Sequence, residues 1–252
     1  MHSEQDDLLV KVPAVTLGFW IIKILATTLG ETGGDAVSMS MDLGYLVATV
    51  IFMGIFVAAV IVQIRARFFH PVIYWTTIVA STTVGTTLAD FATRSLGIGY
   101  SGGSAVLLLL LGGSIFTWYK VLGTVSVLSI STPASEFYYW LTIMFSQTLG
   151  TALGDWTADT AELGYLGAAA IFGSLLLVLV VLHFFTSTSK TVLFWIAFVL
   201  TRPLGAVVGD FLDKPLADGG LALDRYSASV TLLVAIALLI RLLPQRTAEK
   251  AH

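Results

Sequence analysis

Residues 19–35 read FWIIKILATTLGETGGD, and the spacing of tryptophan, glycine and aspartate in this stretch returns three more times along the chain. In each copy a glycine follows the tryptophan by ten residues and an aspartate follows it by fifteen. The four Trp-x9-Gly-x4-Asp motifs are Trp20, Gly30 and Asp35; Trp75, Gly85 and Asp90; Trp140, Gly150 and Asp155; and Trp195, Gly205 and Asp210. Chance would not produce four such matches in one chain, so the motif indicates four internal repeats.

The distances between the motifs divide the chain into two similar halves. The tryptophans are 55, 65 and 55 residues apart, so that residue n aligns with residue n + 120. We expect one membrane domain, residues 1–252, whose halves are related by this 120-residue offset. Its repeats are expected at about 14–65, 71–122, 134–185 and 190–243.

The composition excludes several classes of protein. Of the 252 residues, 56% are hydrophobic and 12% are charged, whereas an ordinary soluble domain has about 25% charged residues. A soluble enzyme and a disordered chain are therefore excluded, and the formal net charge of −3 argues against binding to nucleic acid. The chain has no cysteine, which excludes disulfides, thiolate metal sites and cysteine nucleophiles.

The apolar segments are long enough to cross a bilayer, which takes about 20 residues in a helix. Eight stretches qualify or nearly qualify, and they run at about 13–35, 45–64, 71–92, 104–122, 136–158, 164–185, 191–212 and 227–243. Because they do not alternate apolar and polar residues, a closed barrel is excluded. The sequence thus predicts an all-α integral membrane protein with eight transmembrane helices.

Lysine and arginine in short loops set the orientation of such a protein. The side that holds both termini would carry Lys11, Arg65, Arg67, Lys120, Lys190, Arg241, Arg246 and Lys250, and the opposite side Arg94, Lys214 and Arg225. This distribution predicts that both termini are cytoplasmic. Since each repeat has two spans, all four repeats enter the membrane in the same direction. We expect four parallel two-helix repeats around a polar central axis, with the motif-bearing helices facing the axis and the others facing lipid.

The motifs also resemble a known family. The segments TLGETGGD (28–35), TTLADF (86–91), TLGTALGDW (148–156) and RPLGAVVGD (202–210) are similar to those of the bacterial four-repeat family of uncharacterised membrane-anchored proteins. The resemblance covers about residues 14–243 and implies the fold and a location in the bacterial inner membrane. It implies no activity, so the function must come from the residues themselves.

Steps of four residues from each motif trace one polar stripe on each motif-bearing helix. The stripes are Lys23, Thr27, Glu31 and Asp35; Thr82, Thr86, Asp90 and Arg94; Gln147, Thr151, Asp155 and Asp159; and Arg202, Ala206, Asp210 and Lys214. The other faces are apolar. One polar face on each of four related helices favours a shared hydrated interior.

The stripes carry six carboxylates and four cations, a formal sum of −2. We take as candidate metal ligands Glu31, Asp35, Asp90, Asp155, Asp159 and Asp210, and as counter-ions or gating residues Lys23, Arg94, Arg202 and Lys214. The neutral polar lining is Thr27, Thr82, Thr86, Gln147 and Thr151. Such oxygen ligands suit hard divalent ions such as Mg²⁺, Ca²⁺ or Mn²⁺, and two surplus carboxylates also suit protons. The run from Glu31 to Asp35 is similar to the Glu-x-Gly-Asp motif of calcium and manganese cation/proton exchangers, with one more residue between the acids.

These residues lead to the prediction of a small secondary transporter or channel for a cation, with a divalent metal such as Mn²⁺ and proton coupling as the favoured form. The expected partners are the lipid bilayer and the cation or proton, and the protein would be a monomer or homodimer without enzymatic activity. The tryptophans and glycines of the motif are assigned to helix packing. Three alternatives stay open: ion pairs that only lock the helices together, a membrane-embedded enzyme or lipid-binding protein, and a non-catalytic membrane module.

Overall fold

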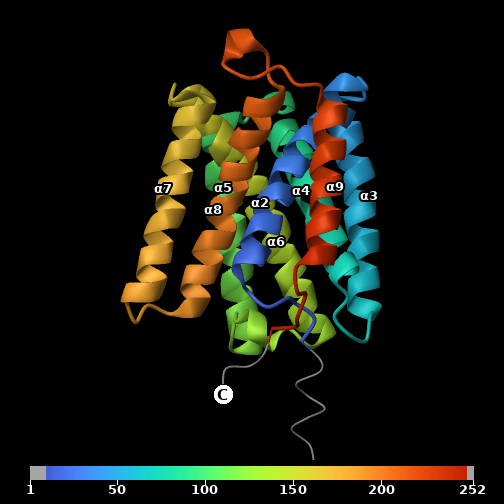
Figure 1. The fold of residues 1–252 in the computed structure, drawn as a ribbon, viewed down its shortest axis with the longest axis vertical. Helices are drawn as coiled ribbons and strands as arrows, with labels where there is room; N and C mark the ends of the chain where they lie inside the picture. Colours follow the sequence, from blue (N-terminus) through green and yellow to red (C-terminus); the bar gives the residue numbers. More distant parts are fainter. Residues whose placement is uncertain (1–9, 249–252) are drawn as a thin grey trace, which may run out of the picture.

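The computed structural model describes residues 10–248, and its regular structure in this range is entirely helical (Figure 1). The long helices are α2 (Leu17–Asp35), α3 (Gly44–Arg65), α4 (Pro71–Asp90), α5 (Gly99–Leu122), α6 (Pro133–Asp155), α7 (Gly164–Phe185), α8 (Lys190–Asp213) and α9 (Arg225–Leu242). Short π-helical segments are η2 (Ala36–Ser40), η3 (Phe91–Ser95) and η5 (Trp156–Thr160), and short 3₁₀ segments are η4 (Val127–Ser129) and η6 (Leu216–Asp218). The all-α prediction is confirmed for this part of the chain.

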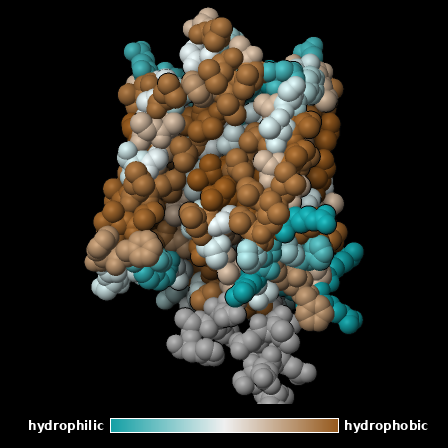
Figure 2. Space-filling model, viewed as in Figure 1, coloured by the Kyte–Doolittle hydropathy of each residue, from teal (hydrophilic) through white to brown (hydrophobic). Residues whose placement is uncertain are grey.

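Five of these helices are long and apolar enough to cross a membrane: α3, α5, α7, α8 and α9. The other three, α2, α4 and α6, are the first helices of three repeats, and they carry the threonines and carboxylates of the polar stripes. Because of these polar residues, α2, α4 and α6 do not meet a test for membrane spans that rests on apolar composition. The five apolar helices support the prediction of a membrane protein. Figure 2 agrees, because apolar residues lie along the bundle and hydrophilic ones gather at its two ends.

The helices begin where the sequence offers caps. The Thr16 hydroxyl accepts a hydrogen bond from the Phe19 backbone N–H (3.2 Å), and Thr132 and Ser135 form a capping box in front of α6. Pro71 and Pro133 occupy the first turns of α4 and α6. Backbone N–H groups in a first turn have no partner within the helix, so the N–H that proline lacks costs no helical hydrogen bond. These signals explain why α4 begins at the residue that the apolar pattern indicates.

The first helices of the four repeats pack against one another in a closed ring. We call α2, α4, α6 and α8 the ring helices: α2 contacts α4 and α8, and α6 contacts the same two helices. The second helix of each repeat, a cover helix, lies on the ring helix of the next repeat. Thus α3 packs on α4, α5 on α6, α7 on α8, and the last helix, α9, returns to α2.

The motif glycines make this close ring possible. A Cβ atom at each of them would collide with a side chain of the neighbouring ring helix, so only glycine fits. The colliding pairs are Gly30 with Thr82, Gly85 with Gln147, Gly150 with Arg202, and Gly205 with Thr27. Four residues later, a second small residue of three ring helices faces the next stripe member: Gly34 faces Thr86, Gly154 faces Ala206 and Gly209 faces Glu31. The glycines therefore set the distance at which the polar stripes meet.

The end of the bundle that holds residues 10–13 and 244–248, here the terminal end, is filled with aromatic side chains. Trp75, Trp140 and Trp195 are buried, Trp20 is half-buried, and the Tyr74 and Tyr139 hydroxyls form a hydrogen bond of 2.6 Å. Two segments cross over these rings: the Lys11 N–H donates to the Ile130 carbonyl (3.2 Å), and Pro13 pairs with Thr247. The terminal end is thereby closed by aromatic packing and by the chain itself.

At the opposite end, three ring helices pass into π-helical turns directly after the motif aspartate. The fourth, α8, continues to Asp213 and then enters a 3₁₀ segment. The residue of α8 that aligns with the last π-helical position of the other repeats is Pro215. Proline has no backbone N–H to donate, so a π turn cannot close there. We call this side of the molecule the aspartate end.

Candidate functional site

Four buried aspartates form a layer at the aspartate end. Asp35, Asp90 and Asp155 are the last residues of α2, α4 and α6, and Asp210 lies in the last turn of α8. Each is at most 3% exposed. Because each ring helix packs against two others and the motif recurs at the same place in each, the repeat brings four carboxylates to one end of the ring.

Two cations bridge these carboxylates in pairs. Arg94 contacts Asp90 (Nε to Oδ1, 2.8 Å) and Asp155 (Nη2 to Oδ2, 3.4 Å). Lys214 contacts Asp210 (Nζ to Oδ1, 3.0 Å) and donates a hydrogen bond to Asp35 Oδ2. Arg94 and Lys214 are 120 residues apart, so the two bridges follow the offset between the halves. Four carboxylates that share two cations leave a formal surplus of −2 in this layer.

Arg202 crosses the bundle one level further toward the terminal end. Its Nη1 and Nη2 donate to Glu31 Oε2 (3.1 and 3.0 Å), and both side chains are almost fully buried. Nη2 also donates to Thr86 Oγ1 (2.6 Å), to the Thr82 carbonyl (3.5 Å) and to Thr151 Oγ1. A side chain from α8 thereby reaches all three other ring helices. Charge-assisted hydrogen bonds of this kind hold Arg202 in one position.

Glu31 joins the aspartate layer to Arg202. Glu31, Asp35 and Asp210 are buried, and each offers one carboxylate oxygen. These three oxygens lie within 4.8 Å of one another. They come from α2 and α8, the first and last ring helices of the chain. We call them the carboxylate cluster. Three hard oxygen donors at this spacing are a set that a divalent cation such as Mn²⁺, Mg²⁺ or Ca²⁺ accepts.

Lys23 and Gln147 lie apart from the carboxylates. The Lys23 side chain is fully buried, its Nζ is 4.2 Å from the centre of the Phe198 ring, and among residues 10–248 it has no hydrogen-bond partner. Both polar atoms of the Gln147 side chain are also buried without a partner in this range. Thr27 donates to backbone carbonyls of Ile24 (2.7 Å) and Thr201 (3.3 Å). Of the predicted lining residues, Thr82, Thr86 and Thr151 therefore contact the charged network, and Thr27 and Gln147 do not.

Asp159 lies outside the cluster. It is exposed in the π-helical segment η5, and its hydrogen-bond partner is the Tyr100 hydroxyl (3.4 Å). The π turn alone does not explain this, because Arg94 holds the same position after Asp90, in the π-helical segment η3, and contacts both Asp90 and Asp155. A carboxylate at this position is repelled by the motif aspartates, which accounts for the exposure of Asp159.

Two charged residues that the stripes do not include lie close to the cluster. Arg225 Nε donates to Asp213 Oδ2 (2.9 Å), and Arg225 Nη2 is 3.9 Å from Asp35 Oδ2. The connection between α8 and α9 brings them there, because it folds back on the end of α8 through hydrogen bonds from Leu221 to Phe211 (2.7 Å) and from Leu223 to Leu212 (2.9 Å). The presence of Pro and two adjacent Gly residues in 210–225 signals an ordered turn, but not which carboxylate Arg225 would meet.

The Asp224 side chain caps α9 just beyond this turn. The Ser227 backbone N–H donates to Asp224 Oδ2 (2.8 Å), as does the Ser227 hydroxyl (2.7 Å). These hydrogen bonds to the ionised form lower the pKa of the Asp224 carboxyl. The cap fixes the start of the helix that presents Arg225.

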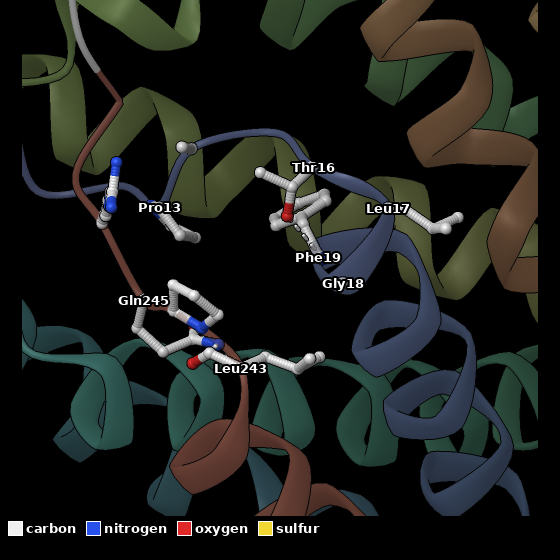
Figure 3. A pocket seen from close by; sticks show the side chains of 10 residues that line it. Pro13, Thr16, Leu17, Gly18, Phe19, Leu243 and Gln245 are labelled. Carbon is white, nitrogen blue, oxygen red and sulfur yellow. Dashed lines mark hydrogen bonds between the residues drawn. The ribbon is translucent and has the colours of Figure 1, made fainter.

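Surface pockets are found at the terminal end, opposite the carboxylate cluster. One, of about 260 Å³, lies between the start of α2 and the C-terminal segment, with Pro13, Phe19 and Leu243 among its walls (Figure 3). At the same end Lys11 Nζ contacts Glu136 Oε1 (2.7 Å) and donates to the Ile64 carbonyl (3.0 Å), which ties the N-terminal segment to α6 and α3. Sequence patterns gave no sign of this pair, because its members are 125 residues apart.

The comparisons with known proteins agree with the internal repeats. No curated protein and no solved structure matches the chain. A family model described as Repeat of Unknown Function (DUF347) matches four times, at residues 18–69, 73–124, 138–189 and 193–247. The resemblance to a four-repeat family of unknown function is thus confirmed, and the chain belongs to the DUF347 repeat family.

Proposed function

We propose that this chain is a secondary transporter for a divalent cation, and that Glu31, Asp35 and Asp210 bind the ion. In this proposal all eight long helices span the bacterial inner membrane, as four parallel pairs around a polar axis with both termini in the cytoplasm. The observation that carries the proposal is the carboxylate cluster, in which three buried acids from two repeats converge within 4.8 Å.

The charges of the site suit a divalent ion. Glu31, Asp35 and Asp210 together with the bound cations Lys214 and Arg202 carry a formal charge of −1. If a divalent ion replaced Lys214, this sum would be zero. Lys214 would return to Asp35 and Asp210 when the ion leaves, so the cluster would never be left as uncompensated buried charge. A proton would serve as a second way to neutralise a carboxylate, which accounts for proton coupling.

The exposed fractions of Arg94, Lys214 and Arg202 support entry of the ion from the aspartate end. The Arg94 side chain is 35% exposed and the Lys214 side chain 12%, whereas Arg202 is completely buried. In the proposal Lys214 and Arg94, which lie nearer to solvent, move outward when the ion enters, whereas Arg202 lies across the axis and keeps its positive charge in place. Such a charge blocks a continuous path for cations. The arrangement favours a carrier that changes conformation over an open channel.

The test is ion uptake by purified protein in liposomes, with Mn²⁺ entry followed by an enclosed fluorescent indicator. We expect Asp35→Asn and Asp210→Asn to reduce uptake by at least 10- to 100-fold, on the order of the effect of removing groups that support a metal site. Asp159→Asn is the matched control, because this exposed carboxylate lies outside the cluster, and its uptake should equal that of the unmodified protein.

Thermal unfolding in detergent separates ion binding from helix locking. A site-specific ion at 100 times its Kd adds about 2.7 kcal/mol of stability, so Mn²⁺ should raise the unfolding temperature of the unmodified protein but not of Asp210→Asn. If the ion pairs only lock the helices, Asp210→Asn lowers the unfolding temperature and no divalent ion shifts that of the unmodified protein. That result would overturn the proposal.

A further inference from the structure

A second pocket at the terminal end, here called the groove, has one apolar and one polar wall. It has a volume of about 560 Å³ and lies between the start of α4 and the end of α9. Its apolar wall comes from Val72 together with Ala237 and Ile240, and its polar groups are His70, Arg241 and Gln245. The Gln245 side chain is held from inside, because its Oε1 accepts a hydrogen bond from Trp75 Nε1 (3.1 Å). This hydrogen bond fixes one polar wall of the groove.

The electrostatic setting of the groove favours an anion. Exposed cations at the same end of the helices are Arg65, Arg67, Lys120, Lys190, Arg241 and Arg246. Within residues 10–248 the one carboxylate at this end is Glu136, which is buried and paired with Lys11. Arg241 and His70 thus face an incoming ligand without a competing acidic neighbour in the described part of the chain.

The apolar wall continues along a helix that the bundle leaves uncovered. On α9, Leu242 is 74% exposed, and Val234 and Leu238 are each more than half exposed. The helix is apolar enough to cross a membrane, and only a small share of its apolar stretch is buried inside the protein. A ligand that occupies the groove therefore meets cationic groups at one end and an apolar helix surface that leads away from them.

We infer that this groove binds an anionic phospholipid, with the phosphate at Arg241 and His70 and the acyl chains along α9 beside Val72 and Ile240. Basic pockets between helices at the cytoplasmic side recognise anionic head groups in this way. The proposed orientation, with both termini in the cytoplasm, puts the groove at that side, so the inference rests on this part of the proposed function. A soluble phosphate compound would leave the apolar wall unused. The inference does not depend on the transported ion.

Native mass spectrometry of the delipidated full-length protein in detergent tests the inference. The probes are phosphatidylglycerol, phosphatidylcholine with the same acyl chains, and glycerol phosphate as the head group alone. We expect one retained phosphatidylglycerol and much less phosphatidylcholine or glycerol phosphate. Removal of one cation near a membrane surface corresponds to about a five-fold loss of affinity, so Arg241→Gln should weaken phosphatidylglycerol binding by about that factor or more.

Arg67→Gln is the matched control, since Arg67 is exposed at the same end but does not line the groove. It should retain phosphatidylglycerol as the unmodified protein does. Equal retention of both lipids, equal loss in Arg67→Gln and Arg241→Gln, or no loss in Arg241→Gln would each overturn the site. Binding of glycerol phosphate as tightly as phosphatidylglycerol would show a soluble anion site and not a lipid site.

Discussion

Arg202 holds the ring together at the scale of single residues. It is buried without solvent contact and donates to side chains or carbonyls on α2, α4 and α6, with Glu31 as its one described carboxylate partner. Such a pair is costly to bury, but it is more costly to break, because the remaining charge then has no partner. Removal of either partner would therefore leave a buried charge uncompensated in the middle of the ring.

We expect Glu31→Gln and Arg202→Met each to lower the free energy of unfolding by about 3–5 kcal/mol, which is typical of a broken buried pair. The double variant should lose less than the sum of the two, because no unpaired charge remains in it. Denaturant unfolding in detergent measures all four free energies of the cycle. Asp159→Asn, as the control, should stay within about 0.5 kcal/mol of the unmodified protein. Additive effects would show that the two charges do not act as a pair.

At the scale of helices, the motif glycines act through contact between ring helices. A methyl group at Gly150 would overlap the Arg202 side chain, whereas one at Gly112 or Gly54, both on cover helices, would meet no atom of another described helix within 4 Å. In the sequence, a helical glycine at a ring contact looks the same as a helical glycine on an open surface. The structure shows which glycine is of which kind.

Gly150→Ala should therefore destabilise the protein by about 1–3 kcal/mol, the usual effect of overpacking. Gly112→Ala and Gly54→Ala should be neutral or stabilising by up to about 1 kcal/mol, because alanine has the higher helix propensity. Thermal or denaturant unfolding of the three variants in detergent measures the difference. If Gly112→Ala is as damaging as Gly150→Ala, the glycines do not act through the ring contacts.

The helices were predictable because apolar runs and caps are local properties of the sequence. The predicted stretches 71–92 and 164–185 match α4 and α7 closely, and the four-residue stripes place Glu31, Asp35 and Asp210 on ring helices. The partner of each charge was not predictable, because it depends on which helices become neighbours. Arg202 meets Glu31 from 171 residues away. The four-residue step also placed Asp159 in the interior, but the step takes no account of charge: a carboxylate there is repelled by the motif aspartates, and Asp159 is exposed.

At the scale of the whole molecule, the two halves are interlocked. Each cover helix packs on the ring helix of the next repeat, so α5 of the first half lies on α6 of the second, and α9 of the second lies on α2 of the first. The contact between α5 and α6 includes the aromatic core, where the centre of the Trp118 ring of α5 lies 6.4 Å from that of the Tyr139 ring of α6. Each half alone would expose a ring helix that the other half covers.

This interlocking predicts that the halves fold together or not at all. Residues 1–124 and 125–252, produced as two chains in the same cell, should assemble into a complex that copurifies through a tag on either chain. The reason is that the two ring-helix contacts between the halves, α4 with α6 and α2 with α8, and the two cover-helix contacts can form without the connecting peptide bond. Either half produced alone should aggregate or be degraded, since its exposed polar stripe has no partner in the membrane. Gly85→Ala in the first chain, where the added methyl would collide with Gln147 of the second chain, should reduce the recovered complex, and Gly112→Ala in the same chain should not. Size-exclusion chromatography and limited proteolysis measure the outcome, and a half that folds alone as a protease-resistant monomer would contradict the interlocked ring.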